Sequence, residues 1–371
     1  MQETAGTSTA TREPVPTRAS RSRPLSRPRG DSGAPVPGRA RRARRRWVIA
    51  GAIALPILLI LAVAGFGLSV WTRIDRVHVQ FPGSPPGGTT YLLIGSDSRD
   101  FVQSPSDKSL FGAPAAADGQ RADIMLLVRQ SADGSVRVLS VPRDLMTQFP
   151  DGSPVRMTLT LQQGPQAVVD TLCQSLGIGV NHLVLVHFDG LRRLVDRAGG
   201  VDVTTEGELR DTVTGLDIPH RGLNHLDGSQ ALAYVRSRHT EILQLDGWHA
   251  IPPTADERSD RARAVLGQLG SRMHLSATAP LSSIEKVWAL SGAITVDDHA
   301  SLFVLRDIAH TLGRISSAPE SRLPVTFHPG DIPTADLQPG AAGVVTKFQG
   351  GATPGCALRT ATDNNPSGGT P

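Results

Sequence analysis

The sequence predicts an α/β or α+β domain built around a layered sheet and preceded by one membrane-spanning helix. Two observations predict this class. An apolar run without charged residues extends from Val48 to Val70, and the chain after it mixes strand patterns with helical patterns. The 371 residues are enough for one large domain or two ordinary ones.

The positive charge of the chain is concentrated ahead of the apolar run. Residues 1–46 carry twelve arginines and three acidic residues, a net charge of +9, whereas the whole chain carries +4. The remainder is therefore net −5, and the high isoelectric point does not indicate a basic binding domain. Because the tail is rich in Pro, Ser, Thr, Gly and Arg, we expect residues 1–46 to be disordered.

The apolar run, residues 47–71, is predicted to cross the membrane. It reads WVIAGAIALPILLILAVAGFGLSVW, and its uncharged part exceeds the roughly 20 residues that a span needs. A tryptophan at each end suits the two interfaces, and the preceding RRARRR marks the cytoplasmic side. A cleaved signal peptide would have a shorter apolar run and a small-residue cleavage site. We expect a single-pass protein of the cell membrane with its N-terminus cytoplasmic and its C-terminal domain extracellular.

Composition divides the rest of the chain into three parts. Residues 72–89 are predicted to be a linker because they contain FPGSPPGG, residues 90–330 to be the folded domain, and residues 331–371 to be a fraying Gly/Pro/Thr-rich tail. Outside the cytoplasm, Cys173 and Cys356 can form a disulfide that ties this tail to the domain. The alternative is a buried Cys173 and a free Cys356, and the sequence leaves both open.

The elements of the domain follow from the periodicity of apolar residues and from turn and cap signals. In order, we expect a strand at 91–94, a hairpin of strands 124–129 and 136–141 around Asp133-Gly134, a helix at 166–178, a strand at 182–188, a helix at 188–200, a strand at 201–205, a helix at 226–236 capped by Asp227, helices at 256–273 and 301–315, and a last strand at 323–327.

Pairs of charged residues mark the ends of five predicted elements. Each pair alone is an ordinary salt bridge or solvated turn, but five in one domain predict a multivalent anion. Arginine binds phosphate through its planar fork, and carboxylates among such arginines suggest Mg²⁺. Arg236 and Arg238 share a face only if the chain is extended after residue 236. Arg258 and Arg261 share a face only if the chain is helical at residue 258. The pairs are Asp97 and Arg99, Arg121 and Asp123, Arg143 and Asp144, Arg236 and Arg238, and Arg258 and Arg261.

Other catalytic signatures are absent from the sequence. It contains no Walker-type glycine loop and no G-x-S-x-G motif. The histidines lack zinc-ligand spacing, and neither cysteine has the context of a nucleophile.

Six segments in order resemble the LytR-CpsA-Psr family. They read LLIGSDSR, RADIMLLV, VLSVPRD, VHFDGLRRLVDRAGGVDV, LDGSQALAYVRSRH and TADERSDRAR. The resemblance covers roughly Tyr91 to Phe327 and implies an extracellular α/β/α domain with a mixed central sheet. It also implies a Mg²⁺-dependent phosphotransferase of cell wall biogenesis. Such an enzyme moves a glycopolymer from polyprenyl pyrophosphate onto peptidoglycan, has a pyrophosphatase side activity, and holds the lipid tail in a hydrophobic tunnel.

The resemblance also implies roles for individual residues. Asp97 and Asp123 would bind the metal, and Asp97, Arg99 and Arg238 would be catalytic, with Asp97 alternatively acting as a base toward the acceptor hydroxyl. Arginines would surround the phosphates, the last of them a weaker match to the motif: Arg99, Arg121, Arg143, Arg236, Arg238, Arg258 and Arg261.

Two departures from the family pattern keep a second interpretation open. Ala262 stands where the family commonly has glutamine, and Arg156-Met157-Thr158 replaces Lys-Ile-Asn. A non-catalytic polyprenyl-phosphate-binding protein is therefore the alternative to a transferase.

A third interpretation, a transcriptional regulator, rests only on the arginine tail, which anionic lipids explain equally well. We expect no specific nucleic acid partner. With 35 arginines and three lysines, the composition favours a GC-rich, actinobacterial genome. The sequence does not identify the glycopolymer: arabinogalactan, a teichoic-acid-like polymer and capsule are all candidates.

Overall fold

The computed structural model describes residues 37–96, 120–251, 255–272, 280–328, 330 and 332–357. The chain divides into two compact units, residues 1–62 and residues 63–371. Helix α1 (Pro37–Arg73) crosses the boundary between them. The described part of the first unit is the beginning of α1, and the second unit contains every other described element.

A seven-stranded mixed sheet forms the centre of the second unit, as the resemblance implies. The strand order is β1-β14-β7-β2-β3-β4-β15. Strands β2 and β7 are parallel, whereas β3 is antiparallel to both β2 and β4. The bounds are β1 Asp75–Val77, β2 Gly88–Ser96, β3 Ala122–Ser131, β4 Val136–Ser140, β7 His182–His187, β14 Ile294–Asp297 and β15 Glu320–Arg322.

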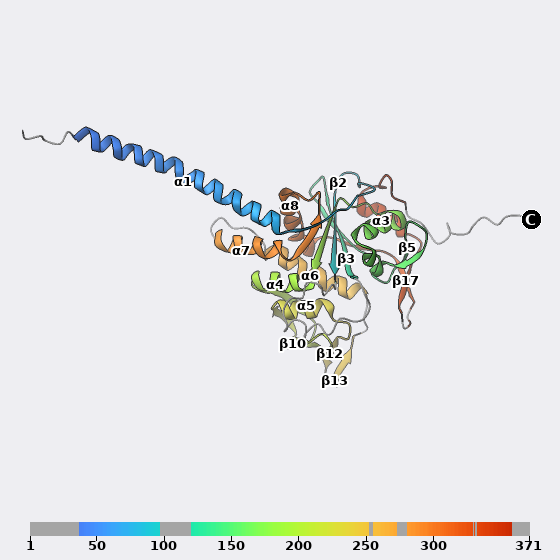
Figure 1. Cartoon of the computed structure of the whole chain (residues 1–371). Coiled ribbons are helices and arrows are strands. Elements are labelled where there is room, and N and C mark those ends of the chain that lie inside the picture. Colours follow the sequence, from blue (N-terminus) through green and yellow to red (C-terminus); the bar gives the residue numbers. More distant parts are fainter. Residues whose placement is uncertain are drawn as a thin grey trace, which may run out of the picture. The chain divides into compact units, whose positions relative to one another are not determined.

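Helices cover both faces of this sheet, because its central strands are apolar on both sides. In β2, Tyr91 and Leu93 join one hydrophobic core, and Leu92 and Ile94 join the other. Figure 1 shows α4, α5 and α6 on one side of the sheet and α3 on the other. The first core is covered by α4 (Phe188–Arg197), α5 (Gly228–Arg236), α6 (Ala255–Arg272), α7 (Pro280–Ser291) and α8 (Leu302–Leu312). The second is covered by η1 (Met157–Gln163), α3 (Pro165–Leu176) and α9 (Ala341–Gln349).

Smaller strand groups and one short helix complete the unit. A four-stranded sheet has the order β10-β9-β12-β13, and the other groups are the pairs β11–β8, β16–β17 and β5–β6. The bounds are β5 Met146–Gln148, β6 Pro154–Arg156, β8 Val201–Thr205, β9 Leu209–Asp211, β10 Leu216–Ile218, β11 Gly222–Leu226, β12 Glu241–Gln244, β13 Gly247–Ala250, β16 Val325–His328, β17 Thr334–Leu337 and η2 Ile315–Ser317.

The predicted elements are present in the predicted order. The hairpin of β3 and β4 turns at Asp133-Gly134, where Gly134 has a φ of 80°. Asp227 caps α5 by accepting a hydrogen bond from the backbone N–H of Gln230 at 2.8 Å. These features follow from local signals, so the sequence alone was sufficient to place them.

The predicted linker at 72–89 is wrong for its first half. Helix α1 continues to Arg73, β1 begins at Asp75 and pairs with β14, and Val79 is fully buried. Val70 and Ile74 are each only 5% exposed and belong to the first core. The folded unit therefore incorporates the last turns of the apolar helix, because their side chains find apolar partners in the domain.

The predicted fraying tail at 331–371 is also wrong for its described part. Strand β17 pairs with β16, and α9 buries Val345 and Phe348 in the second core. Gln349 joins this helix to the loop before β7, since its side chain accepts from the N–H of Gly179 at 2.7 Å and donates to the carbonyl of Gly177 at 2.9 Å. Glycine and proline content concealed these elements, which depend on long-range contacts.

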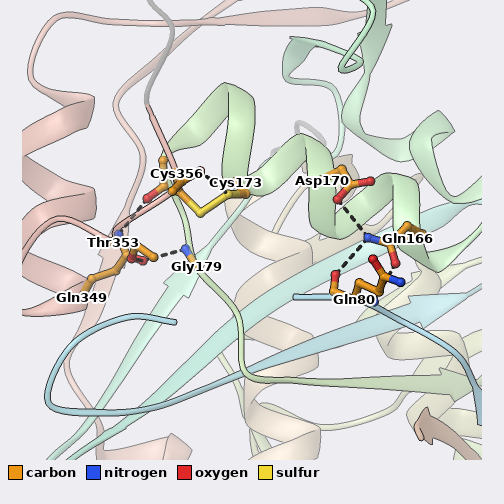
Figure 2. The surroundings of a disulfide bond; sticks show 10 residues. Gln80, Gln166, Asp170, Cys173, Gly179, Gln349, Thr353 and Cys356 are labelled. Carbon is orange, nitrogen blue, oxygen red and sulfur yellow. Dashed lines mark hydrogen bonds between the residues drawn. A yellow bond between two sulfur atoms is a disulfide. The ribbon is translucent and has the colours of Figure 1, made fainter. Parts of the chain in front are cut away.

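A disulfide between Cys173 and Cys356 fastens the end of the described chain to α3. Thr353, three residues before Cys356, donates to the side chain of Gln349 at 2.6 Å (Figure 2). The bond closes a loop of 183 residues, and a loop of that length removes about 5 kcal/mol of chain entropy from the unfolded state in the entropic account. Of the two alternatives that the sequence left open, the structure thus has the disulfide-bonded pair.

Replacing both cysteines with serine is expected to lower the free energy of unfolding by about 2–5 kcal/mol. Thermal or denaturant unfolding of the full chain in detergent measures the change. Adding a reductant to the natural protein should reproduce the loss, and adding it to the double variant should change nothing. Equal stability of the reduced and oxidised proteins would contradict a structural role for the bond.

Candidate anion site at the edge of the sheet

The register of the sheet brings two of the predicted charge pairs to one edge. Ser96 at the end of β2 pairs with Ala122 at the start of β3, and Ser140 at the end of β4 pairs with Leu126 of β3. Arg121, Asp123, Arg143 and Asp144 therefore lie at the same edge. Asp97 and Arg99 follow Ser96 directly but lie outside the described residues.

Asp123 occupies a β-bulge at this edge. Gly95 pairs with Ile124 and Ser96 pairs with Ala122, so Asp123 is the extra residue on β3. A bulge turns the side chain of its extra residue out of the normal alternation and often occurs beside functional sites. The bulge thus directs the carboxylate of Asp123 to the edge of the sheet.

Two arginines from distant parts of the chain share the carboxylate of Asp123. Nη1 of Arg143 lies 2.5 Å from Oδ1, and Nη2 of Arg238 lies 3.0 Å from Oδ2. Asp123 and Arg143 are 13% and 15% exposed, whereas Arg238 is 44% exposed. Arg143 is therefore largely shielded from water, whereas the guanidinium of Arg238 remains accessible from outside.

Asp144 is the second carboxylate of the group, and it is 6% exposed. Nε of Arg143 lies 3.3 Å from its Oδ1, and Nη1 of Arg156 lies 3.8 Å from the same oxygen. Arg156 is the residue that replaces the lysine of the family pattern, so the structure gives that position a charged partner.

Arg258, in the first part of α6, is held beside the same charges. Burial and the positive charges of Arg143 and Arg238 lower the pKa of Arg258 to about 10, while Asp123 and Asp144 act in the opposite direction. The guanidinium remains charged at neutral pH despite this shift. With Arg156 included, four arginines thus lie around two carboxylates, which leaves positive charge for an anion to balance.

The chain becomes extended after Arg236, which is the condition that the sequence set for Arg236 and Arg238 to share a face. Helix α5 ends at Arg236, and Ser237 has an extended backbone with ψ of 132°. Arg238 reaches Asp123, whereas the guanidinium of Arg236 lies over the ring of Phe188 with its carbon 5.2 Å from the ring centroid. Arg236 therefore lies beside Phe188, an apolar residue next to the site.

Arg261 has a different environment from the one that the sequence predicted for a phosphate ligand. It is 5% exposed, its Nη1 donates to Oγ1 of Thr240 at 2.9 Å, and its Nη2 pairs with Glu257. Its guanidinium also lies over the ring of Tyr234, 5.1 Å from the centroid. Because Thr240, Glu257 and Tyr234 already engage the guanidinium of Arg261, we leave Arg261 out of the anion site and keep Arg258 in it.

Asp211, at the end of β9, is a residue that the sequence analysis missed. It is fully buried, and its Oδ2 accepts from the hydroxyl of Ser237 at 2.6 Å and from the backbone N–H groups of Arg238 and His239 at 3.1 and 3.0 Å. Oδ1 accepts from the N–H groups of Val213 and Thr214. One carboxylate therefore fixes the backbone that carries Arg238.

The environment of Asp211 favours its charged form. Burial opposes ionisation, but the hydrogen bonds from Ser237 and from the backbone outweigh it and lower the pKa of Asp211 to about 2. A signal for this residue did exist, since an aspartate followed by a turn often accepts hydrogen bonds from N–H groups two and three residues later.

Two adjoining apolar cavities lie behind the charged edge. The lining of the first includes Gly95, Ile124 and Phe188 beside the charges. The second lies between α4, α6, α7 and α8. The cavities share the lining residues Leu93, Val186, Leu191 and Leu266. They form a nearly continuous apolar space that starts next to the anion site.

Residues 72–288, more than half of the chain, match the LytR_cpsA_psr family. The chain is 30% identical over 199 residues to the probable cell wall biosynthesis protein LcpB of Corynebacterium glutamicum, covering 53% of this chain and 47% of that protein. It is 25% identical to the polyisoprenyl-teichoic acid–peptidoglycan teichoic acid transferase TagU of Halalkalibacterium halodurans, covering 63% of this chain and 73% of that one. The matched region is thus about half the length of LcpB.

A solved structure, the LytR-Csp2A-Psr enzyme from Actinomyces oris, has the same fold. Its TM-score is 0.60 at 27% sequence identity, and the match covers 75% of this chain and 96% of that one.

Asp211→Asn is expected to destabilise the protein above pH 4 and to lose this effect as the pH falls toward 2. Because the pKa of Asp211 is lower in the folded protein than in the unfolded chain, its charged form stabilises the fold above the unfolded pKa and ceases to do so through the folded pKa. We expect a difference of about 2 kcal/mol near neutral pH. Denaturant unfolding of both proteins across this pH range measures it.

Asp217→Asn is the matched control for this experiment, since Asp217 is an exposed residue of β10 in the same small sheet. Its effect should be small at every pH. A constant difference between wild type and Asp211→Asn from pH 7 to pH 2 would contradict the account.

Proposed function

The chain belongs to the LytR-CpsA-Psr family, and we propose that it transfers a glycopolymer from a polyprenyl-pyrophosphate carrier onto peptidoglycan. The observation that carries this proposal is the position of the anion site beside an apolar cavity. A polyprenyl-pyrophosphate donor combines the two chemistries in the same order, a doubly phosphorylated group joined to a long apolar chain. The similarity to teichoic acid transferases supports the same substrate class.

Charge supports a diphosphate as the bound anion. Arg143, Arg156, Arg238 and Arg258 lie around two carboxylates. Burial and, after it, the positive charges of Arg143 and Arg238 lower the pKa of Arg258. Arginines in a partly dry site bind phosphate oxygens through paired hydrogen bonds. We propose that Arg99, Arg121 and Arg236 complete this group when the donor is bound.

The donor set at the edge fits Mg²⁺. Asp123 presents a carboxylate directed outward by its bulge, beside arginines that would hold phosphate oxygens. A hard cation of this kind binds through one or two carboxylates together with the phosphates of its substrate. We propose that Asp123 and Asp97 hold the ion, which would neutralise charge on the diphosphate.

Transfer in this site requires positioning and charge stabilisation more than a protein nucleophile. The hydroxyl oxygen of the acceptor sugar forms a bond to the phosphorus that carries the glycan. The bond from that phosphorus to the bridging oxygen breaks, and polyprenyl phosphate leaves with the electron pair. Asp97 is our candidate to accept the hydroxyl proton. Arg238, the exposed member of the pair on Asp123, is placed to stabilise the charge that develops.

We propose that the protein is anchored in the membrane with its folded unit outside the cytoplasm. Helix residues Arg46–Arg73 are long and apolar enough to span a bilayer, and RRARRR before them favours a cytoplasmic N-terminus. The disulfide supports the same orientation, because such bonds persist mainly outside the reducing cytoplasm.

Asp123→Ala and Arg238→Ala are each expected to reduce transfer by about 100-fold or more, since each removes a charged contact from the reacting group. The full chain in detergent is incubated with a polyprenyl-pyrophosphoryl glycan, a peptidoglycan acceptor and Mg²⁺, and the release of polyprenyl phosphate is followed. Removal of Mg²⁺ by a chelator should abolish the release.

Arg210→Ala is the matched control, because the partners of Arg210 are Glu241 and Trp248 on the four-stranded sheet rather than Asp123. It should transfer at the wild-type rate. Tight binding of the donor by the wild type without any release would contradict the transferase. That result would instead favour the non-catalytic binder. Ala262, the residue after Arg261, would then be the candidate cause of the lost catalysis.

A further inference from the structure

The end of the apolar helix is built into the folded unit. Phe66, Val70 and Ile74 follow one another at four-residue intervals, and all three pack against the first core. Strand β1 begins at Asp75, so no linker separates the helix from the sheet. Any surface of the unit that contacts residue 73 therefore lies close to the bilayer if the helix spans it.

Helix α7 contacts residue 73 and carries exposed apolar side chains. The guanidinium carbon of Arg73 lies 4.4 Å from the ring centroid of Trp288. Trp288 is 40% exposed and Ile284, four residues earlier on the same face, is 43% exposed. Val287 and Leu290 pack against the core instead. The helix is thus apolar on two faces, only one of which is covered by the residues that the structure describes.

We propose that this face of α7, Ile284 and Trp288, docks into the headgroup region of the membrane. The proposal rests on the membrane anchoring proposed above. Tryptophan with a neighbouring arginine is typical of the bilayer interface, where the indole ring is apolar and the guanidinium meets phosphate. Chain connectivity favours a bilayer over a second copy of the chain, because the span ends at the arginine that covers Trp288.

Docking would place one wall of the larger cavity at the membrane. Leu290 of α7 and Leu305 of α8 both line that cavity, and α8 adds the exposed residues Leu302 and Phe303 at its start. A polyisoprenyl chain could then pass from the bilayer into the cavity between protein and lipid without crossing water.

Single-cysteine labelling tests the proposal on the full chain. Both natural cysteines are joined in the disulfide, so an added cysteine is the only free thiol. An environment-sensitive fluorophore is attached in separate proteins to Ile284→Cys, to Glu285→Cys on the neighbouring exposed position, to Leu58→Cys within the apolar run, and to Leu245→Cys. Leu245 is the matched control, a fully exposed leucine in the turn between β12 and β13.

The labelled proteins are reconstituted in vesicles of zwitterionic and anionic phospholipids, with or without a nitroxide on the acyl chains. The label at 284 should lose most of its emission to the nitroxide, the label at 285 less, and the label at 245 none. Unchanged thermal unfolding verifies that each variant is folded.

Quenching at 58 without quenching at 284 would overturn the docking proposal while leaving the anchor intact. Absence of quenching at 58 would overturn the anchor and the docking proposal together. Protection of 284 from a water-soluble quencher, without quenching by the labelled lipid, would assign the face to a second copy and also overturn it.

Discussion

The carboxylate of Asp123, shared between Arg143 and Arg238, is the interaction on which the site depends. It joins the start of β3 to the loop after β4 and to the segment after α5, which are far apart in the sequence. A bulge in β3 makes the contact possible by giving Asp123 a direction that regular pleating would not. Asp211 fixes the backbone of Arg238, because it accepts a hydrogen bond from the backbone N–H of Arg238 rather than from its guanidinium. Side chain and backbone of Arg238 are thus fixed by two different carboxylates.

Placing several arginines close together in a partly buried position costs free energy, and the structure shows how this cost is limited. Two carboxylates lie among four guanidinium groups, and burial together with the charges of Arg143 and Arg238 lowers the pKa of one of them, Arg258. A site that retains excess positive charge without a ligand is preorganised for an anion, because little reorganisation is needed when the anion binds. The adjoining apolar cavities support the proposal that this anion carries a lipid. The fold itself supplies both parts, since the sheet edge carries the charges and the space beneath α4 and α6 is left open.

Local signals predicted much of the fold and part of the site. The hairpin turn and the cap on α5 follow from residue types at fixed spacings, and their positions agree with the structure. Long-range features could not be predicted in this way. The bulge at Asp123 depends on the register between β2 and β3, and the separation of Arg258 from Arg261 depends on how α6 packs against Tyr234. Helix α9 was missed because its glycine-rich surroundings suggested a tail, whereas its stability comes from burial of Phe348 and from the disulfide.

The most direct measurement of the central claim is the affinity of the full chain for a short-chain isoprenyl diphosphate compared with the isoprenyl alcohol of the same length. Titration calorimetry in detergent, at two salt concentrations, separates the contributions of charge and of apolar contact. If the arginines at the sheet edge form the anion site, the diphosphate should bind more tightly than the alcohol. Its advantage should decrease at higher salt and be lost in Arg258→Ala. Equal affinities for the two ligands, or an advantage unchanged in that variant, would contradict the claim.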